Sequence, residues 1–248
     1  MPFLYKIYGW FLSVDVPWES IFALILPFDQ QQLFVYLPVN LTQIWVLFIG
    51  MCIINATDLL FACLVHLLSM EFDNLAQSIS DIDWDNDDDE GEEEAFKELK
   101  LLVTIHQELC EIASKLHKIF SFLMLVNIFT SIFAICIVTF LAISGINNYF
   151  LVKFSVPLVG MFMQIFLHCF FGDRLIESSS KVANGVYNSG WYKANPKYRK
   201  MALIIMVRAQ RKQKIQAWKF ADINLKTYCW IITTAHSYYS FLSGVYHV

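Results

Sequence analysis

The stretch that decides the fold is Arg208–Phe220, RAQRKQKIQAWKF, which carries five of the chain's 18 Lys and Arg residues. Apolar segments flank it on both sides, MALIIMV at 201–207 and YCWIITTAHSYYSFLSGVY at 228–246. The 248-residue chain is 57% hydrophobic and 16% charged, whereas soluble domains are about 25% charged. A short basic segment in so apolar a chain indicates the aqueous edge of a bilayer, and its side of the bilayer sets the topology.

Four segments are apolar over the roughly 20 residues that a helix needs to cross the hydrocarbon core of a bilayer. They are residues 44–68, 120–143, 151–171 and 228–248, and the last is the most polar. We therefore predict an all-α membrane protein with four transmembrane helices.

The distribution of basic residues predicts the side that each connecting segment faces, because Lys and Arg accumulate on the cytoplasmic side. Residues 172–227 hold twelve of the 18 and residues 69–119 hold four, whereas residues 1–43 hold only Lys6. Both long segments are therefore predicted to be cytoplasmic and to carry long helical extensions. Residues 1–43, the short loop 144–150 and the C-terminus are predicted to be extracellular. The sequon Asn40-Leu41-Thr42, a predicted glycosylation site, agrees with this topology.

The same topology places the first residue outside the cell. The apolar stretch IFALILPF at 21–28 is too short to span a bilayer, so nothing before residue 44 would carry Met1 across. This mismatch suggests a chain that begins within a larger membrane protein.

An acidic run occupies the first predicted cytoplasmic segment. Residues 81–98 contain eleven of the chain's 22 Asp and Glu residues. Such a block is typical of a solvated, disordered loop. A calcium site is disfavoured, because the run lacks a twelve-residue loop with alternating ligands and a central turn glycine.

Two apolar segments allow more than one interpretation. Residues 201–207 are apolar on every face but too short to span, so they form either a core within the chain or a contact between subunits. In the last span, small and hydroxyl side chains recur at spacings of four, three and four, which places them on one helical face. They are Thr233, Ser237, Ser240 and Gly244. Such a face either lines water in a pore or allows close helix packing.

Chemistry-bearing side chains are few. Asp58 lies within the first span, where a carboxylate has either a functional role or a structural polar contact. His106, Cys110 and His117 share a helical face without a fourth ligand, so we predict no metal site. The chain has no phosphate-binding glycine loop and no nucleophile–base pair, so we predict neither an enzyme nor a cofactor.

Several elements in order resemble the C-terminal region of insect odorant receptors. The matching positions are Gly172, Ser178–Ser180, Tyr187, Trp191-Tyr192, Arg208-Ala209-Gln210 and the ending Ser237-Tyr238-Tyr239-Ser240-Phe241. LPFD at 26–29 and IHQEL at 105–109 are similar to loops of that family. The resemblance implies that the four spans are the last four of a seven-span receptor with inverted topology in the plasma membrane.

The resemblance also implies a function. A tuning receptor of this kind forms an odorant-gated, non-selective cation channel with a shared co-receptor, as a hetero-tetramer. The expected ligand is a small volatile hydrophobic molecule, and the expected surroundings are membrane lipids, with no nucleic acid. The expected pore-lining residues are Ser237, Phe241, Gly244 and Val245. The expected subunit anchor is Tyr187, Trp191, Met201, Ile204, Ile205 and Arg208. The ligand-pocket candidates are Gln43, Phe48, Met51, Phe140, Val159 and Met163.

Two functions follow from the sequence. In the first, the chain is part of a tuning receptor subunit. In the alternative, it is a truncated, non-channel isoform that assembles with full-length receptors and modulates them.

Overall fold

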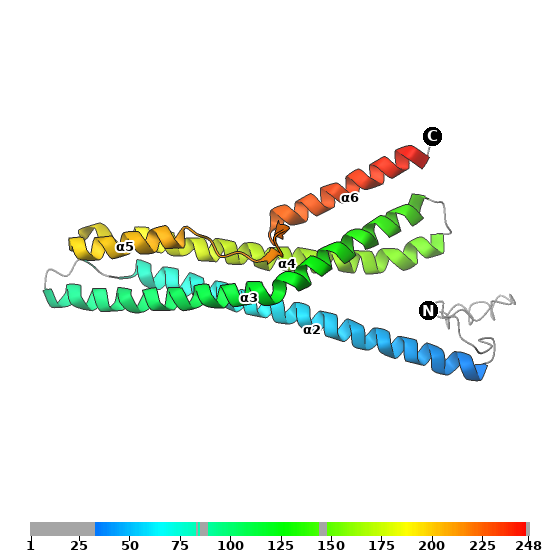
Figure 1. The fold of residues 1–248 in the computed structure, drawn as a ribbon, viewed down its shortest axis with the longest axis horizontal. Coiled ribbons are helices and arrows are strands. Elements are labelled where there is room, and N and C mark those ends of the chain that lie inside the picture. Colours follow the sequence, from blue (N-terminus) through cyan, green and yellow to red (C-terminus); the bar gives the residue numbers. More distant parts are fainter. Residues whose placement is uncertain (1–32, 83, 85–88, 144–147, 247–248) are drawn as a thin grey trace. The chain divides into compact units, whose positions relative to one another are not determined.

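The computed structural model describes residues 33–82, 84, 89–143 and 148–246. Residues 1–32 of the predicted extracellular segment 1–43 and the loop positions 144–147 therefore lie outside the described residues. The helices are α2 (Leu33–Ser80), α3 (Asp89–Ile143), α4 (Asn148–Asn188), the short 3₁₀ helix η1 (Trp191–Lys193), α5 (Pro196–Ala209) and α6 (Leu225–Tyr246) (Figure 1). Strands β1 (Gln216–Ala217) and β2 (Ala221–Asp222) form a small antiparallel hairpin. The chain divides into two compact units, residues 1–59 and 60–248.

Within the described residues, three helical segments are long and apolar enough to cross a membrane. They are Phe34–Ser80, Gly91–Val138 and Leu158–Asn188. Each is longer than the roughly 20 residues that a bilayer requires, so part of each helix extends beyond the hydrocarbon core. The predicted all-α fold is confirmed. Helix α6 is not among these segments, so the fourth span stays a prediction.

The acidic run is helical from Asp89 onward, and the expected disordered loop is wrong for that part. Carboxylates suit the first turns of a helix because the macrodipole is positive there. The Glu92 carboxylate also accepts a hydrogen bond of 3.1 Å from the backbone N–H of Asn195, just before α5. Phe96 then packs on Tyr198, with ring centroids 4.5 Å apart. These contacts attach the start of α3 to the start of α5.

The core of the second unit lies between α2, α3 and α4. Phe61 of α2 contacts Phe120 of α3 edge to face. Phe72 of α2 and Leu175 and Val182 of α4 are fully buried in the same core. Helices α2 and α4 approach closely at Gly185, where a Cβ atom would overlap the backbone carbonyl of an α2 residue. Apolar side chains on the outer faces of these helices stay exposed, as a lipid-facing surface requires.

Residues 210–224 form the hairpin rather than part of a helix, so the predicted run of anchor helices over 172–227 is wrong for that segment. The basic stretch buries three of its few apolar side chains, Ala209, Ile215 and Ala217. Its five basic residues remain exposed. Gly172 of α4 permits this packing, since a Cβ there would overlap the Ile223 carbonyl oxygen.

Candidate pore helix and subunit-contact surface

Helix α6 begins at a side-chain cap. The Asn224 carboxamide oxygen accepts a hydrogen bond of 2.9 Å from the backbone N–H of Thr227, which satisfies one of the free donors of the first turn. The Thr227 hydroxyl in turn donates to the Asp222 carbonyl at 2.6 Å. The hairpin therefore fixes where α6 starts.

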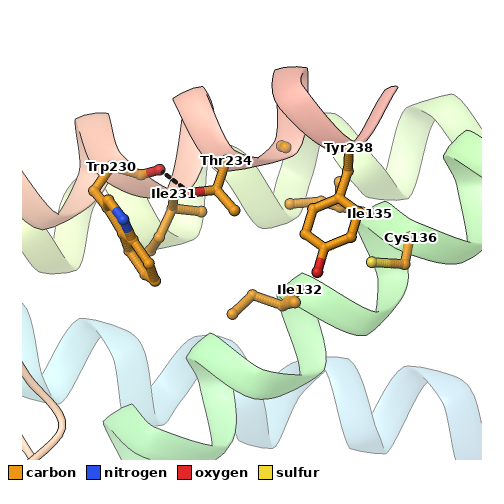
Figure 2. A pocket seen from close by; sticks show the side chains of 8 residues that line it. Ile132, Ile135, Cys136, Trp230, Ile231, Thr234 and Tyr238 are labelled. Atoms are coloured by element: carbon orange, nitrogen blue, oxygen red, sulfur yellow. Dashed lines mark hydrogen bonds between the residues drawn. The ribbon is translucent and has the colours of Figure 1, made fainter. Parts of the chain in front are cut away.

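One face of α6 packs toward α3. Ile231 on this face is buried, and Ala235 is half-buried. A small apolar pocket of about 40 Å³ lies between the two helices (Figure 2). Its walls are Ile132, Ile135 and Cys136 of α3 and Trp230, Ile231, Thr234, Ala235 and Tyr238 of α6.

The hydroxyl-rich face of α6 is directed away from that packing. Thr233, Ser237, Ser240 and Gly244 are all exposed. At 100° per residue they lie on the side of the helix opposite Ile231 and Ala235. The Ser237 hydroxyl donates to the Thr233 carbonyl at 2.9 Å, and Thr233 donates to the carbonyl of Cys229. These two hydroxyl groups thus donate their hydrogen bonds within α6, while each hydroxyl oxygen can still accept a hydrogen bond.

Of the expected pore positions, Ser237 and Gly244 belong to this face. Ser237 is exposed, Phe241 is 68% exposed, and a Cβ at Gly244 would meet nothing within 4 Å. The side chain of Val245 lies outside the described part. Their pore role stays a prediction.

The all-apolar segment 201–207 lies in α5, where some of its side chains are buried and others are exposed. Ala202 and Ile205 are buried, with Ile205 only 4% exposed, so this side belongs to the chain's own core. Ile204 and Val207 are 69% and 63% exposed. The sequence left open a core within the chain and a contact between subunits. The face with Ile205 belongs to the core, whereas the face with Ile204 and Val207 is apolar and exposed, so it is the face on which a subunit contact could form.

The other expected anchor residues surround this helix. Tyr187 and Arg208 are exposed, whereas Trp191 and Met201 are half-buried. Ile205 is a core residue and presents no surface to a partner. The remaining anchor assignments stay predictions.

The ligand-pocket candidates fall in both units of the chain. Gln43 is buried, Phe48 and Met51 are exposed, and these three belong to residues 1–59. The candidates in the second unit are exposed: Phe140, Val159 and Met163. None of the six lines the pocket between α3 and α6. They too stay predictions.

Two polar positions of α2 were singled out from the sequence. Asn40 is buried, and its amide nitrogen donates to the Tyr36 carbonyl at 2.9 Å. This nitrogen is the atom that a glycan would modify, so the hydrogen bond argues against glycosylation, which stays a prediction. Asp58 is half-buried.

The sequence did not reveal the polar contacts by which the hairpin docks on α3. The backbone N–H of Gln216 donates to His117 Nδ1 at 3.2 Å, and the N–H of Trp218 donates to the Ser121 hydroxyl at 2.8 Å. The alternation of Lys214, Ile215, Gln216 and Ala217 is a strand signal, but the dense positive charge obscures it. His117 is therefore a hydrogen-bond acceptor for the hairpin, and the shared face with His106 and Cys110 serves packing.

His106 and Cys110 lie beside each other in the part of α3 that precedes the predicted span 120–143. His106 Nε2 is 3.6 Å from Cys110 Sγ. Burial, and then the positive charge of Arg208, lower the pKa of His106 below its usual 6.5. Burial raises the pKa of Cys110, against the opposite effect of Arg208. Both groups are thus held neutral.

A carboxylate on α2 joins two basic residues of α4. Asp73 pairs with Arg174 at 3.1 Å and with Lys181 at 3.2 Å. Residues 174 and 181 are seven apart, two helical turns, so both reach the same partner. No sequence pattern connected these positions, because the pairing depends on the register of α2 against α4.

Long apolar helices and a final helix with an unused hydroxyl face define a multi-span, all-α membrane protein. The chain belongs to the insect odorant receptor family, since the family described as 7tm Odorant receptor matches residues 4–236. It is a family of receptors rather than of enzymes.

Individual relatives agree. The chain is 27% identical over 190 residues to putative odorant receptor 92a of Drosophila melanogaster, covering 77% of this chain and 46% of that protein. It is 25% identical over 247 residues to odorant receptor 85b of the same fly, covering 98% of this chain and 61% of that one. The insect olfactory receptor OR5 from Machilis hrabei, solved in complex with eugenol, shares the fold with a TM-score of 0.81 at 17% identity, over 98% of this chain and 60% of that one. The chain thus spans less than two thirds of the length of these relatives.

Proposed function

We propose that this chain is an olfactory receptor subunit that contributes to an odorant-gated, non-selective cation channel together with a shared co-receptor. In this proposal α6 lines the ion path, and the exposed side of α5 contacts a neighbouring subunit. The ligand is a small volatile hydrophobic molecule, and the assembly is a hetero-tetramer in the plasma membrane.

The observation that carries the proposal is the division of α6 into two faces. Its apolar face packs toward α3, while its small and hydroxyl side chains are exposed on the opposite side. A lipid-facing surface gains nothing from exposed Thr and Ser side chains. A water-filled path uses them, because their oxygens offer hydrogen bonds to water and to hydrated ions.

The exposed side of α5 supports the assembly. Leu203, Ile204 and Val207 form an apolar strip next to the basic stretch. Apolar side chains in contact with water are a sign of an unoccupied interface. A second subunit that covers this strip would bury it.

The odorant is proposed to bind at the six candidate positions on the outer halves of the spans. The receptor from Machilis hrabei, solved with eugenol, is a relative by fold that takes a small aromatic molecule. The candidates in α3 and α4 are apolar and exposed in the single chain, which suits contact with a hydrophobic ligand.

The orientation is proposed from the basic residues, with the C-terminus outside the cell. An epitope tag after Val248 should be accessible on intact cells, whereas one in the acidic run should require permeabilisation. The reverse pattern would overturn both the orientation and the proposed pore.

Cysteine accessibility tests the ion path. The chain is expressed with the co-receptor, with the exposed Cys52, Cys63 and Cys229 replaced by Ser to remove background. It carries Ser237→Cys, Gly244→Cys or the control Ala235→Cys. A charged, water-soluble thiol reagent should change the current in the first two variants and leave the third unaffected. Equal responses would refute the pore assignment. Normal assembly without current would favour the alternative of a non-channel modulator.

A further inference from the structure

The turn of the hairpin carries two large aromatic side chains that the rest of the chain leaves uncovered. Ala217 pairs with Ala221, so residues 218–220, Trp-Lys-Phe, connect the two strands. Trp218 and Phe220 are each 58% exposed. A turn in contact with water is usually made of Gly, Pro, Asn, Asp or Ser, which suit tight turns for conformational reasons. Two aromatic residues at this turn therefore require another explanation.

The backbone at Trp218 adopts a conformation that a bulky residue rarely takes. Its φ angle is 54°, in the left-handed region that favours glycine, and among the described residues only Gly190 also has a positive φ. The Trp218 N–H donates to the Ser121 hydroxyl of α3 at 2.8 Å. The Phe220 N–H donates to the Ala217 carbonyl at 2.9 Å. These hydrogen bonds hold a strained turn in place, which points to a function for the side chain that the turn presents.

The aromatic side chains of the turn lie beside exposed aromatic side chains of α3. The Trp218 ring meets Phe122 edge to face, with centroids 6.5 Å apart. The Phe220 ring lies 5.9 Å from that of Phe129. Phe122 and Phe129 are exposed and seven residues apart, so they share one face of the helix. This part of α3 belongs to the segment Gly91–Val138, which is apolar enough to cross a membrane. The four rings therefore form an aromatic patch that is continuous with the surface of a spanning helix.

Two lysines accompany the aromatic patch. Lys118 lies four residues before Phe122 on the same face of α3, and Lys219 stands between the two aromatic residues of the turn. Both lysines are exposed, and neither has an ion-pair partner among the described residues. The acid nearest to the turn in the sequence, Asp222, pairs with Lys214 at 3.1 Å. Aromatic rings next to lysines are typical of the boundary between headgroups and acyl chains, where Trp is enriched and lysine extends into the polar layer.

We propose that the hairpin turn is a membrane-interface anchor: Trp218 and Phe220 lie in the headgroup region of a phospholipid bilayer, and Lys219 reaches the lipid phosphates. An exposed apolar patch marks a surface for either a membrane or a protein. The bilayer is favoured because the aromatic patch continues the lipid-facing side of α3 and because its two cations have no acid beside them.

The position of the turn gives the anchor a consequence. Figure 1 shows the hairpin where α6 begins, next to α3. Strand β2 leads directly to Asn224, which caps α6. A turn held in the headgroup region therefore fixes the depth at which α6 starts. The contact with lipid does not depend on the proposed channel function.

Spin-label accessibility in nanodiscs of phosphatidylcholine and phosphatidylserine tests the anchor on the full chain. The exposed cysteines are first replaced by Ser: Cys52, Cys63 and Cys229. A nitroxide is then attached at Lys219→Cys or, as the control, at Lys212→Cys, and the signal of the chain without either new cysteine is subtracted. Lys212 lies beside Asn184 of α4, beyond the predicted span 151–171. Relaxation by oxygen, which concentrates in lipid, and by a water-soluble nickel chelate reports the surroundings of each label.

The two reagents distinguish the possible surroundings of the turn. At position 219 oxygen should relax the label more strongly than the nickel chelate does, and at position 212 the order should be reversed. Strong relaxation by nickel at both positions would place the turn in water and overturn the proposal. Weak relaxation by both reagents at position 219 would show that a protein surface covers the turn, and it would overturn the proposal as well.

Trp218→Gly separates anchoring from folding. Glycine suits a φ of 54°, so this variant should keep the size-exclusion profile of the parent chain while it loses the ring. With the label at position 219, Trp218→Gly should shift the preference from oxygen toward nickel. The control Phe133→Ala removes an exposed ring of α3 outside the aromatic patch and should leave the preference unchanged. An unchanged oxygen preference in a well-folded Trp218→Gly variant would mean that Trp218 only packs on Phe122, and the anchor would be refuted.

Discussion

Replacing Ile204 by Asp on α5 tests the proposed subunit contact. Ile204 is 69% exposed in the single chain, whereas the adjacent Ile205 is 4% exposed. The two positions are neighbours on the same helix and differ only in the face they occupy. Ile204→Asp should therefore leave the fold of the chain intact and act on assembly alone.

The magnitude follows from what a partner would cover. Full burial of an Ile side chain contributes about 1.5–3 kcal/mol, and the 69% still exposed leaves about 1–2 kcal/mol for an interface. A carboxylate buried without a partner adds a cost of at least about 2 kcal/mol. The sum is at least about 3 kcal/mol, which corresponds to an association roughly 100-fold weaker at each contact.

The assay is co-purification of the tagged chain with the co-receptor, together with size-exclusion profiles of the chain alone. Ile204→Asp should give a normal profile alone and a strong loss of the co-receptor. Ile205→Asp is the matched control and should destabilise the chain itself, with low yield or aggregation. Unchanged co-purification of a well-expressed Ile204→Asp variant would refute the assignment of this face to an interface.

Two further predictions concern stability. Burial favours neutral His106, and the nearby charge of Arg208 acts the same way, so stability is fully present above the unfolded pKa of about 6.5 and is lost as the pH falls from there toward the lower folded pKa. The melting temperature in detergent should fall between pH 7.5 and pH 5.5, and His106→Leu should flatten that slope while His236→Gln should not. Gly172→Ala should destabilise by about 1–3 kcal/mol, because its methyl group overlaps a backbone carbonyl just before α6. Gly160→Ala, with open space around the added carbon, should be neutral or slightly stabilising in the same melting assay.

The sequence predicts the all-α class well because lipid-facing helices must be continuously apolar. Segments of that kind in α2, α3 and α4 are visible from composition alone. The spacing of Thr233, Ser237 and Gly244 likewise identifies one helical face. Which face of α6 packs against the rest of the chain depends on the tertiary structure. The burial of Ile231 in the structure identifies that face.

Other features were beyond sequence reasoning for physical reasons. The strand alternation in KIQA extends over four residues, too few for periodicity to outweigh the surrounding charge. The acidic run has a composition typical of disorder, yet its second half is helical because Glu92 and Phe96 find partners near the start of α5. Such partners are far away in the sequence and leave no local pattern.

The hairpin connects the two surfaces on which the proposed function depends. It follows α5 directly, bonds to α3 through His117 and Ser121, and ends at the cap of α6. Its buried Ile215 holds the same segment in the core, with the Ile223 N–H donating to the Ile215 carbonyl at 2.8 Å. A displacement of α5 relative to α3 must therefore either break these hydrogen bonds or pass into the first turn of α6. If the proposed subunit contact displaces α5, the hairpin is the segment through which that displacement would reach the proposed pore helix.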